Sequence, residues 1–357
     1  MAMRRLESGG TQIDPPHREV LKSMNATSLW LTEDAVSRLV SLEDAIEALE
    51  RSLLEAADGT AFNVPKALGD VGRGGAMHCL GSASPQAGVC GFKTWVHTDQ
   101  GAKAVFSLFS TANGQLLAMM EANTLGQLRT AAMTAVGTRW LVTDPGVNEM
   151  AVIGSGKQAL GQILAINIVR PLSRIHIWSP NAERRRQFVD KVRANLGHAE
   201  VIDAPSMEAA TEGARLVTVV TRATQPFFPA TLLAPGAHLN AVGAILPGNA
   251  EIFPDVFERA KSIVVDDITN TRKASREFID YFGADDENWT RVQPLSDVIR
   301  QRGARAGAGD ITLFKAMGMG LSDLAIARMA HERAMADTDA AIRLPLTAPA
   351  PVRLRAA

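Results

Sequence analysis

Two cationic residues of this sequence lie in apolar surroundings, where a charge needs a partner or a task. Lys93 lies within the largely apolar segment 89–96, and a lysine in a buried strand is costly unless it is paired or functional. Burial also lowers the pKa of a lysine, which would make Lys93 a proton donor near neutral pH. The alternative is a lysine on the solvent side of an edge strand, which protects against aggregation.

Arg129 is the second such cation. On a helix it shares one stripe with Leu125, Ala132 and Val136, so its guanidinium would point toward apolar neighbours. An inward arginine needs an anion, and a substrate carboxylate held by two hydrogen bonds would serve. A structural ion pair or a snorkelling side chain is the alternative. Lys66 is a weaker candidate for a second contact with the same anion.

A glycine turn between an apolar run and a helical segment indicates a dinucleotide site. The run 150–153 predicts a strand, and 158–169 predicts a helix. The first glycine allows a tight turn, the second lets phosphates approach the backbone, and a small residue lets the helix pack on the strand. The free N–H groups of the helix start would hold the anion. The residues predicted to bind the pyrophosphate are Gly154, Ser155, Gly156, Lys157, Gln158 and Ala159.

The end of the next predicted strand, 174–178, bears on the type of cofactor. An acidic residue that binds a ribose 2′-hydroxyl is expected there, but the strand is followed by Ser179, with Asn181 and Arg184 beyond it. A hydroxyl and a guanidinium suit a 2′-phosphate, so the sequence favours NADP(H), with NAD(H) as the alternative. Further groove residues are expected at two later strand ends: Thr221, Arg222, Ala223, Val242 and Gly243.

The pattern of elements predicts the architecture around these residues. Strands alternate with helices from residue 149 onward, which is typical of a doubly wound parallel sheet. Residues 62–120 contain strand signals without helices and predict an antiparallel or mixed sheet. Segment 32–57 predicts two helices broken near 39–41, with Ser41 as a cap, and Asn123 or Thr124 can cap a helix that ends near Val142.

We therefore predict an α/β protein with a Rossmann-type domain and a discontinuous α+β substrate domain. A helical pattern over 310–336 is expected to return to the first domain, and Asp310 and Asp323 are expected to cap helical segments. The predicted parts are a poorly ordered segment 1–26, a substrate domain of 27–145 and 310–345, a nucleotide-binding domain of 146–309, and a flexible tail 346–357.

Composition excludes several classes of protein. The formal net charge is −1, so nothing favours nucleic acid or an anionic membrane as a partner. Cys79 and Cys90 are the only cysteines, too few for a disulfide framework and wrongly spaced for zinc, and we expect no metal site. The first residues contain no apolar signal region, and no apolar run is long enough to span a membrane. These features predict a cytoplasmic protein.

These segments together resemble the ornithine cyclodeaminase/mu-crystallin family. The segments that carry the resemblance are Gly91-Phe92-Lys93, 128–132, 152–159, and 310–315 continuing to Gly318 and Asp323. The resemblance implies a homodimer formed through the first domain and an amino or imino acid bound against the nicotinamide. It also implies that Arg129 holds the substrate carboxylate and that Lys93 lies beside the reacting carbon and nitrogen. Lys315 and Gly318 are assigned to cofactor binding.

The sequence departs from the family pattern at two positions. Ile245 stands where ornithine cyclodeaminases have an aspartate that handles the substrate amine. An isoleucine cannot do this, which argues against ornithine cyclisation and suits a less polar substrate end. Lys66 replaces an arginine, so it keeps the charge but loses the planar, two-pronged grip on a carboxylate.

The predicted function is an NAD(P)H-dependent oxidoreductase that acts on the C–N bond of an imine, ketimine or α-amino acid. Lys93 and Arg129 are its candidate catalytic residues, and Lys66 and Ile245 would complete the contacts with a small imino or amino acid. Two alternatives stay open. One is a cyclodeaminase-like lyase that uses NAD as a recycled prosthetic group, and the other is a non-catalytic, NADPH-dependent small-molecule-binding protein.

Overall fold

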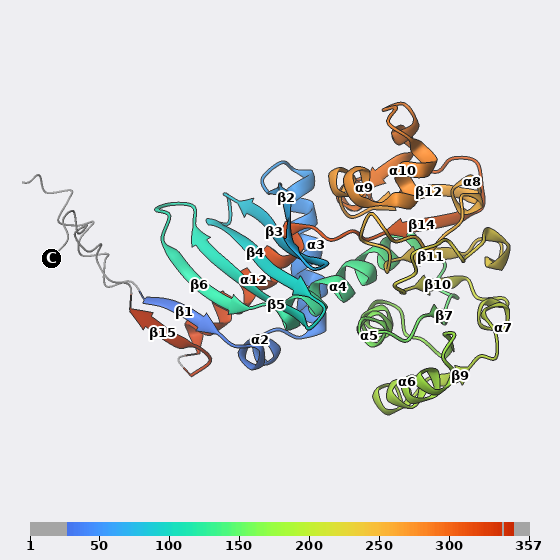
Figure 1. Cartoon of the computed structure of the whole chain (residues 1–357), viewed down its shortest axis with the longest axis horizontal. Helices are drawn as coiled ribbons and strands as arrows, with labels where there is room; N and C mark the ends of the chain where they lie inside the picture. The colour runs from blue at the N-terminus through green and yellow to red at the C-terminus, as the bar shows by residue number, and fades with distance from the viewer. Residues whose placement is uncertain (1–26, 338, 346–357) are drawn as a thin grey trace, which may run out of the picture.

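The computed structural model describes residues 27–337 and 339–345. They form two lobes, each built on its own β-sheet (Figure 1). The predicted terminal segments 1–26 and 346–357 lie outside the described residues. None of the helices in the described part is long and apolar enough to cross a membrane.

The first lobe contains a seven-stranded sheet in the order β15-β1-β6-β5-β4-β3-β2. Strands β2 to β6 pair antiparallel in sequence order, β1 joins β6 in parallel, and β15 closes the other side of β1 antiparallel. The expected antiparallel or mixed sheet is therefore confirmed. Its strands are β1 (Thr27–Leu31), β2 (Phe62–Gly72), β3 (Gly75–Ser84), β4 (Val89–Thr98), β5 (Gly101–Ser110), β6 (Leu116–Glu121) and β15 (Ile342–Pro345).

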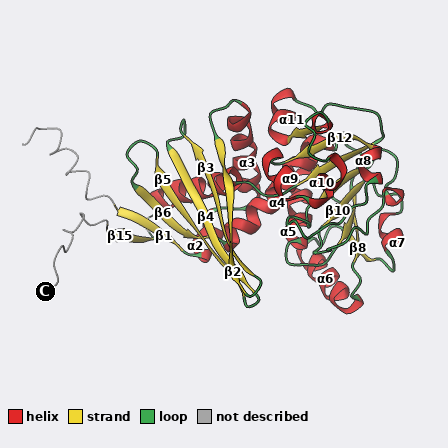
Figure 2. Cartoon of the chain, turned by 45° about the horizontal axis from the view of Figure 1, so that its top comes forward, coloured by secondary structure: helices red, strands yellow, loops and turns green. Residues whose placement is uncertain are grey.

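Helices cover one face of this sheet (Figure 2). They are α2 (Glu33–Leu39), α3 (Leu42–Ala57), α4 (Asn123–Leu141) and α12 (Gly320–Ala336). The predicted break is confirmed, and Ser41 and Asp44 form a reciprocal capping box at the start of α3. The expected cap of α4 is wrong: the carboxylate of Glu33, not a side chain of α4, accepts the N–H groups of Asn123 and Thr124.

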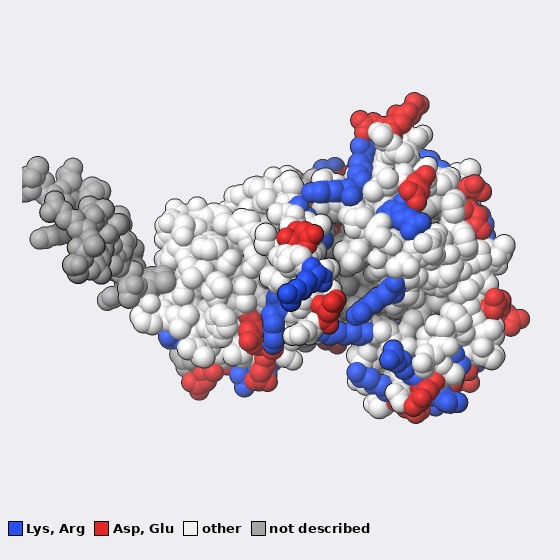
Figure 3. Space-filling model, in the orientation of Figure 1, with Lys and Arg blue, Asp and Glu red and all other residues white. Residues whose placement is uncertain are grey.

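The opposite face of the sheet carries exposed apolar side chains. Strand pairing places Val64 opposite Gly81 and Gly81 opposite Phe92, and it places Met77 opposite Val96. Because Lys93 points to the helical face, its neighbour Phe92 points away from it. The first lobe shows few charged side chains in the view of Figure 3, whereas charges gather where the lobes meet and over the second lobe. We call the exposed side chains on this face, Phe62, Val64, Met77, Phe92 and Val96, the outer sheet face.

The second lobe is a parallel sheet of eight strands in the order β13-β12-β14-β11-β10-β7-β8-β9. Its strands are β7 (Glu149–Ile153), β8 (Arg174–Trp178), β9 (Glu200–Asp203), β10 (Leu216–Val219), β11 (His238–Ala241), β12 (Ala260–Val265), β13 (Val292–Pro294) and β14 (Ile311–Lys315). Its helices are α5 (Ala159–Val169), α6 (Ala182–Asn195), α7 (Met207–Thr211), α8 (Asp255–Arg259), α9 (Ile268–Ala274), α10 (Arg276–Phe282) and α11 (Leu295–Gln301), with short 3₁₀ turns η2 (Ala230–Leu232) and η3 (Asn288–Arg291). The α/β fold with a doubly wound parallel sheet is therefore present.

The helix predicted over 310–336 is wrong in its first part. Residues 311–315 form β14, which lies between β12 and β11 inside the parallel sheet, and α12 begins only at Gly320. A short apolar run is equally compatible with a buried strand and a buried helix. Asp310 does not cap a helix either, because its carboxylate pairs with Arg259. The return to the first lobe is therefore made by the chain that follows Lys315.

Helix α4 packs against both lobes. Thr138 on α4 accepts a hydrogen bond from the Asn240 side chain of β11 at 3.0 Å. Gly137 lies against Phe314 of β14 so closely that a Cβ there would be 2.8 Å from the ring. This packing holds the Arg129 helix against the sheet of the second lobe.

Candidate active site

Lys93 forms a buried ion pair with an aspartate 230 residues further along the chain. Its Nζ lies 2.7 Å from Oδ1 of Asp323, and the side chains are 6% and 0% exposed. Burial lowers the pKa of Lys93 to about 8; the charge of Asp323 opposes this shift, and that of Arg129 adds to it. Lys93 thus lies on the inner face of β4, at the first turn of α12, with the pKa of a usable proton donor.

Asp323 is a site residue that the sequence analysis missed. It was expected to cap a helix, but its carboxylate makes no cap and instead contacts Lys93 and Arg129. Its position inside the apolar run 321–327, which is buried throughout, was the available signal. An aspartate there is as unusual as a lysine in the segment 89–96.

Arg129 lies beside the same carboxylate, but this contact leaves hydrogen-bonding capacity of its guanidinium unused. Its Nε is 3.4 Å from Oδ1 of Asp323, and its side chain keeps 16% of its surface exposed. Within the described residues, neither Nε of Arg129 nor Oδ2 of Asp323 has a hydrogen-bond partner. Because two cations share one aspartate, the site has positive charge available for a bound carboxylate.

Lys66 completes the cationic group. Burial lowers its pKa, and the nearby charges of Arg129 and Lys273 lower it further. Its Nζ lies 5.7 Å from the centre of the Trp95 ring, and Lys93 Nζ lies 5.2 Å from the same ring. The structure therefore brings together Lys66, Lys93 and Arg129, the three cations singled out in the sequence.

The glycine turn follows β7 as predicted and leaves room for a dinucleotide. Gly154 has a φ of +127°, and a Cβ there would lie 2.5 Å from the carbonyl oxygen of Val220. Gly156, by contrast, has no atom within 4 Å of its Cβ position. An open backbone before an 11-residue helix, α5, is the cradle that a pyrophosphate requires. Around it, Lys157 is exposed, Gln158 is partly exposed and Ala159 is buried.

The end of β8 contains the residues expected to select the cofactor. Ser179 is buried, and its Oγ lies 2.9 Å from Oγ of Ser155 in the glycine turn. Asn181 caps α6 by accepting the Arg184 N–H, and the Arg184 side chain is exposed. Arg185 has a structural task, because it pairs with Asp203 and donates to the carbonyl of Ser179.

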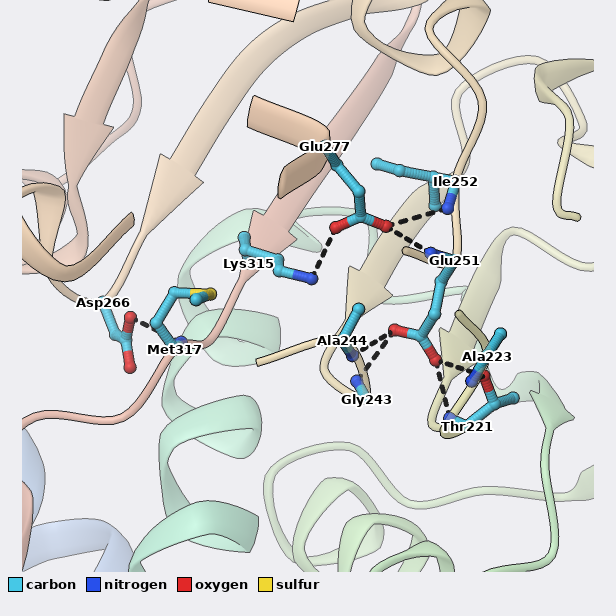
Figure 4. Close-up of polar contacts among 10 residues, drawn as sticks. All are labelled: Thr221, Ala223, Gly243, Ala244, Glu251, Ile252, Asp266, Glu277, Lys315 and Met317. Atoms are coloured by element: carbon cyan, nitrogen blue, oxygen red, sulfur yellow. Dashed lines mark hydrogen bonds and ion pairs between the residues drawn. The ribbon is translucent and has the colours of Figure 1, made fainter. Parts of the chain in front are cut away.

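A buried glutamate joins the loops that follow β10 and β11 (Figure 4). One oxygen of Glu251 accepts the N–H and the hydroxyl of Thr221, at 2.6 and 2.8 Å. The other accepts the N–H groups of Gly243 and Ala244, at 2.8 and 2.9 Å. Burial raises the pKa of Glu251, against the charge of Lys315 and the hydrogen bonds. Because these N–H groups donate to Glu251, they are not free for a ligand. A ligand would be contacted by other atoms of the two loops.

A second buried ion pair lies next to this glutamate. Nζ of Lys315 lies 2.7 Å from Oε2 of Glu277, and the side chains are 0% and 1% exposed. The other oxygen of Glu277 accepts the N–H groups of Glu251 and Ile252, at 2.5 and 2.9 Å (Figure 4). Lys315 was assigned to cofactor binding. In the structure its side chain instead contacts Glu277 and has no exposed surface.

Gly318 joins the second lobe to Arg129. It has a φ of +88°, and a Cβ there would lie 2.7 Å from Nη1 of Arg129. Asp266 accepts the N–H groups of Met317 and Gly318, and Asn270 donates to the carbonyl of Gly318 at 2.9 Å. Burial raises the pKa of Asp266 to about 6. The loop after β14 is therefore held firmly against Arg129.

The remaining predicted residues lie in the loops at the same edge of the sheet. Arg222 is exposed, and the N–H of Ala223 donates to the hydroxyl of Thr221 at 3.2 Å. Val242 is buried, whereas Ile245 is 39% exposed. Among the described residues, no group of acidic, cysteine or histidine side chains is arranged to hold a metal ion.

Comparison with known proteins agrees with this geometry. The sequence model of the ornithine cyclodeaminase/mu-crystallin family matches residues 27–338. The ketimine reductase mu-crystallin of Mus musculus is 30% identical over 226 residues, which cover 63% of this chain and 67% of that protein. The crystal structure of a probable ornithine cyclodeaminase from Bordetella pertussis is 27% identical, with a TM-score of 0.79 over 87% of this chain and 98% of that one.

An archaeal alanine dehydrogenase, solved as a dimer with bound NAD, has the same fold. It is 23% identical, with a TM-score of 0.80 over 89% of this chain and 99% of that one. The family match spans both lobes and includes Lys93, Arg129, the glycine turn and Asp323. This chain belongs to the ornithine cyclodeaminase/mu-crystallin family.

Proposed function

We propose that this protein is an NAD(P)H-dependent oxidoreductase that reduces the C=N bond of an α-imino acid, or oxidises the corresponding amino acid. The observation that carries the proposal is the buried Lys93–Asp323 pair with Arg129 beside it. The ketimine reductase activity named for the mouse relative supports the same reaction class.

The two halves of the site meet at one edge of the parallel sheet. All strands of that sheet run in the same direction, so the glycine turn after β7 and the Gly318 loop after β14 lie at its carboxyl edge. Gly318 in turn touches Arg129. A dinucleotide held by the glycine turn can therefore extend toward the cations of the first lobe.

The chain's own residues would act in sequence. Arg129 and Lys66 bind the substrate carboxylate and orient the imine. Lys93 donates the proton that the imine nitrogen gains on reduction, and Asp323 holds the ammonium in position. A pKa of about 8 keeps Lys93 protonated at neutral pH yet acidic enough to give up the proton. The hydride for the imine carbon would come from a reduced nicotinamide bound at the glycine turn.

Reduction of a panel of imines tests this proposal. The panel contains cyclic ketimines and the imines that form from 2-keto acids with methylamine, and the absorbance of the reduced nicotinamide is followed. Consumption of reduced nicotinamide supports the oxidoreductase. Release of ammonia from a diamino acid without net change in absorbance would instead favour the cyclodeaminase, and tight binding without turnover would favour a binding protein.

We further propose that NADP(H) is the preferred cofactor. Ser179 and the exposed Arg184 at the end of β8 suit a 2′-phosphate, and within the described residues no acidic side chain follows that strand directly. Comparison of kcat/KM for NADPH and NADH, with one imine at a fixed concentration, tests this preference. A larger value with NADH would overturn it.

We also propose that the protein forms a homodimer through the outer sheet face. Exposed apolar patches of this kind mark interaction sites, and a two-fold dimer brings the same patch of two subunits together. Light scattering during gel filtration should give a dimer for the wild type and a monomer for Phe92→Glu. A monomeric wild type at micromolar concentration would contradict this proposal.

A further inference from the structure

Three side chains form a cross-strand wall on the inner face of the first sheet, and the mechanism above does not use them. Leu68 on β2 pairs with His78 on β3, and His78 pairs with Trp95 on β4. Trp95 lies two residues after Lys93 and therefore points to the same face. We call Leu68, His78 and Trp95 the side-chain wall.

Ring stacking holds the centre of the side-chain wall, and part of the wall is exposed. The rings of His78 and Trp95 stack with their centroids 4.4 Å apart and their planes within 1° of parallel. His78 is 9% exposed, and its Nδ1 has no hydrogen-bond partner among the described residues. Stacking rather than hydrogen bonding thus holds the imidazole. Leu68 is 58% exposed and Trp95 is half-buried, so both have surface left for a ligand.

The wall also lies next to the atoms that would bind and protonate the substrate. The Trp95 ring centre is 5.2 Å from Nζ of Lys93 and 5.7 Å from Nζ of Lys66. A substrate with its nitrogen at Lys93 and its carboxylate at Lys66 and Arg129 must therefore lie beside the indole. Its side chain then has the wall as its nearest protein surface.

The charges around the wall disfavour an ammonium on that side chain. Both cations that lie over the indole ring are lysines, Lys93 and Lys66. Asp267, which faces β2, accepts hydrogen bonds from Asn63 and from the start of α9. Burial lowers the pKa of His78, and the charges of Lys66 and His97 lower it further, so the imidazole adds no negative charge to the wall. The wall offers an aromatic and aliphatic surface instead of an anion.

We propose that the side-chain wall is the subsite for the substrate side chain and selects α-imino acids that carry a flat aromatic group. This inference rests on the proposed imine reduction and adds to it the substrate class. Flat aromatic groups stack on an indole, whereas a methyl group or a flexible amine gains little from it. Trp95 is thereby a specificity-determining residue.

The experiment compares two imines that differ only in the side chain, formed from methylamine with phenylpyruvate or with pyruvate. The wild type should reduce the aromatic imine with about tenfold higher kcat/KM, the size expected for one aromatic contact. Trp95→Leu should abolish this preference, while Trp95→Phe should retain most of it. Trp140→Leu, which removes an indole of α4 that donates to Glu50 of α3, is the matched control and should keep the preference.

Two results would overturn the inference: a wild type without preference for the aromatic imine, or a Trp95→Leu variant that keeps it. A wild type that reduces neither imine would count against the proposed reaction instead. In that event, calorimetric titration with phenylpyruvate and pyruvate, in the presence of the oxidised dinucleotide, tests the subsite alone. Tighter binding of phenylpyruvate that is lost in Trp95→Leu supports the subsite, and equal binding of both acids refutes it.

Discussion

Two buried lysine–carboxylate pairs, one in each lobe, have the same length and opposite surroundings. Lys93–Asp323 and Lys315–Glu277 both measure 2.7 Å between nitrogen and oxygen. Around Asp323 the polar groups are incompletely satisfied, since its second oxygen and Nε of Arg129 have no hydrogen bond among the described residues. The second oxygen of Glu277, by contrast, accepts two backbone N–H groups.

We propose that this difference separates a reactive site from a structural one. An incompletely satisfied buried charge costs stability, and proteins keep such groups where they bind or react. A fully satisfied network stabilises one arrangement of its loops. Here the first pair would bind substrate and transfer a proton, and the second, through Glu251, would hold the loops that carry Thr221 and Gly243.

Replacement of Lys93 should have the largest effect, and that effect should be on the rate of turnover. Lys93→Met removes the proton donor, and loss of a general acid lowers turnover by about 10²–10⁴-fold. Binding of the dinucleotide, measured by calorimetry, should stay within about threefold of the wild type because the glycine turn is untouched. Survival of most of the activity would show that Lys93 is not the proton donor.

Replacement of Lys315 should act on stability instead. Lys315→Met leaves Glu277 buried without its cation, and such a change costs about 3–5 kcal/mol. Urea unfolding should show this loss, while turnover per folded molecule falls far less than in Lys93→Met. Because the single variant can fail to fold, Lys315→Met with Glu277→Gln is made as well; it should recover part of the stability. A loss of turnover in Lys315→Met as large as that in Lys93→Met, without loss of stability, would contradict the structural role of the Lys315–Glu277 pair.

Replacement of Asp323 should move the pH dependence of the reaction. Lys93 acts as an acid, so activity falls as the pH rises through its pKa. Asp323 holds that pKa up, and its loss in Asp323→Asn should shift the alkaline limb of kcat/KM to lower pH by about one unit or more. Asp310→Asn breaks a surface pair with Arg259 and should leave the profile unchanged. An identical profile in Asp323→Asn would exclude this electrostatic role.

A methyl group at Gly318 should have the smallest effect. In Gly318→Ala the new Cβ displaces the guanidinium of Arg129, which should raise KM for the substrate by about tenfold or less. Gly213 has a similar positive φ, +69°, and Gly213→Ala would place its Cβ with no neighbour within 4 Å. It should lower stability by about 1 kcal/mol without changing KM. Equal KM in both variants would show that the contact with Arg129 has no function.

Several features could be predicted from local sequence because the physics behind them is local. The glycine turn, the start of α3 and the alternation of strands and helices each depend on residues a few positions apart. Arg129 and Lys93 were singled out because each interrupts an apolar pattern. The family resemblance supplied the substrate role of Arg129, which the pattern alone left open between a ligand and an ion pair.

Other features were decided by contacts between distant segments. Glu33 satisfies the first turn of α4 from about 90 residues away in sequence. Segment 311–315 became a strand because two neighbouring strands offered hydrogen bonds to both of its edges. No local signal distinguishes that outcome from a buried helix.

Lys93 and Lys315 show which properties of a site can be predicted from sequence and which depend on the tertiary structure. By itself the sequence determined that Lys93 lies in an apolar segment and needs a partner or a function, whereas Lys315 was assigned to the cofactor through the family resemblance. Only the tertiary structure supplied the partners, Asp323 and Glu277, and the hydrogen bonds around them. A buried charge is defined by everything within a few ångströms of it, and for Lys93 that neighbourhood is assembled from segments more than 200 residues apart.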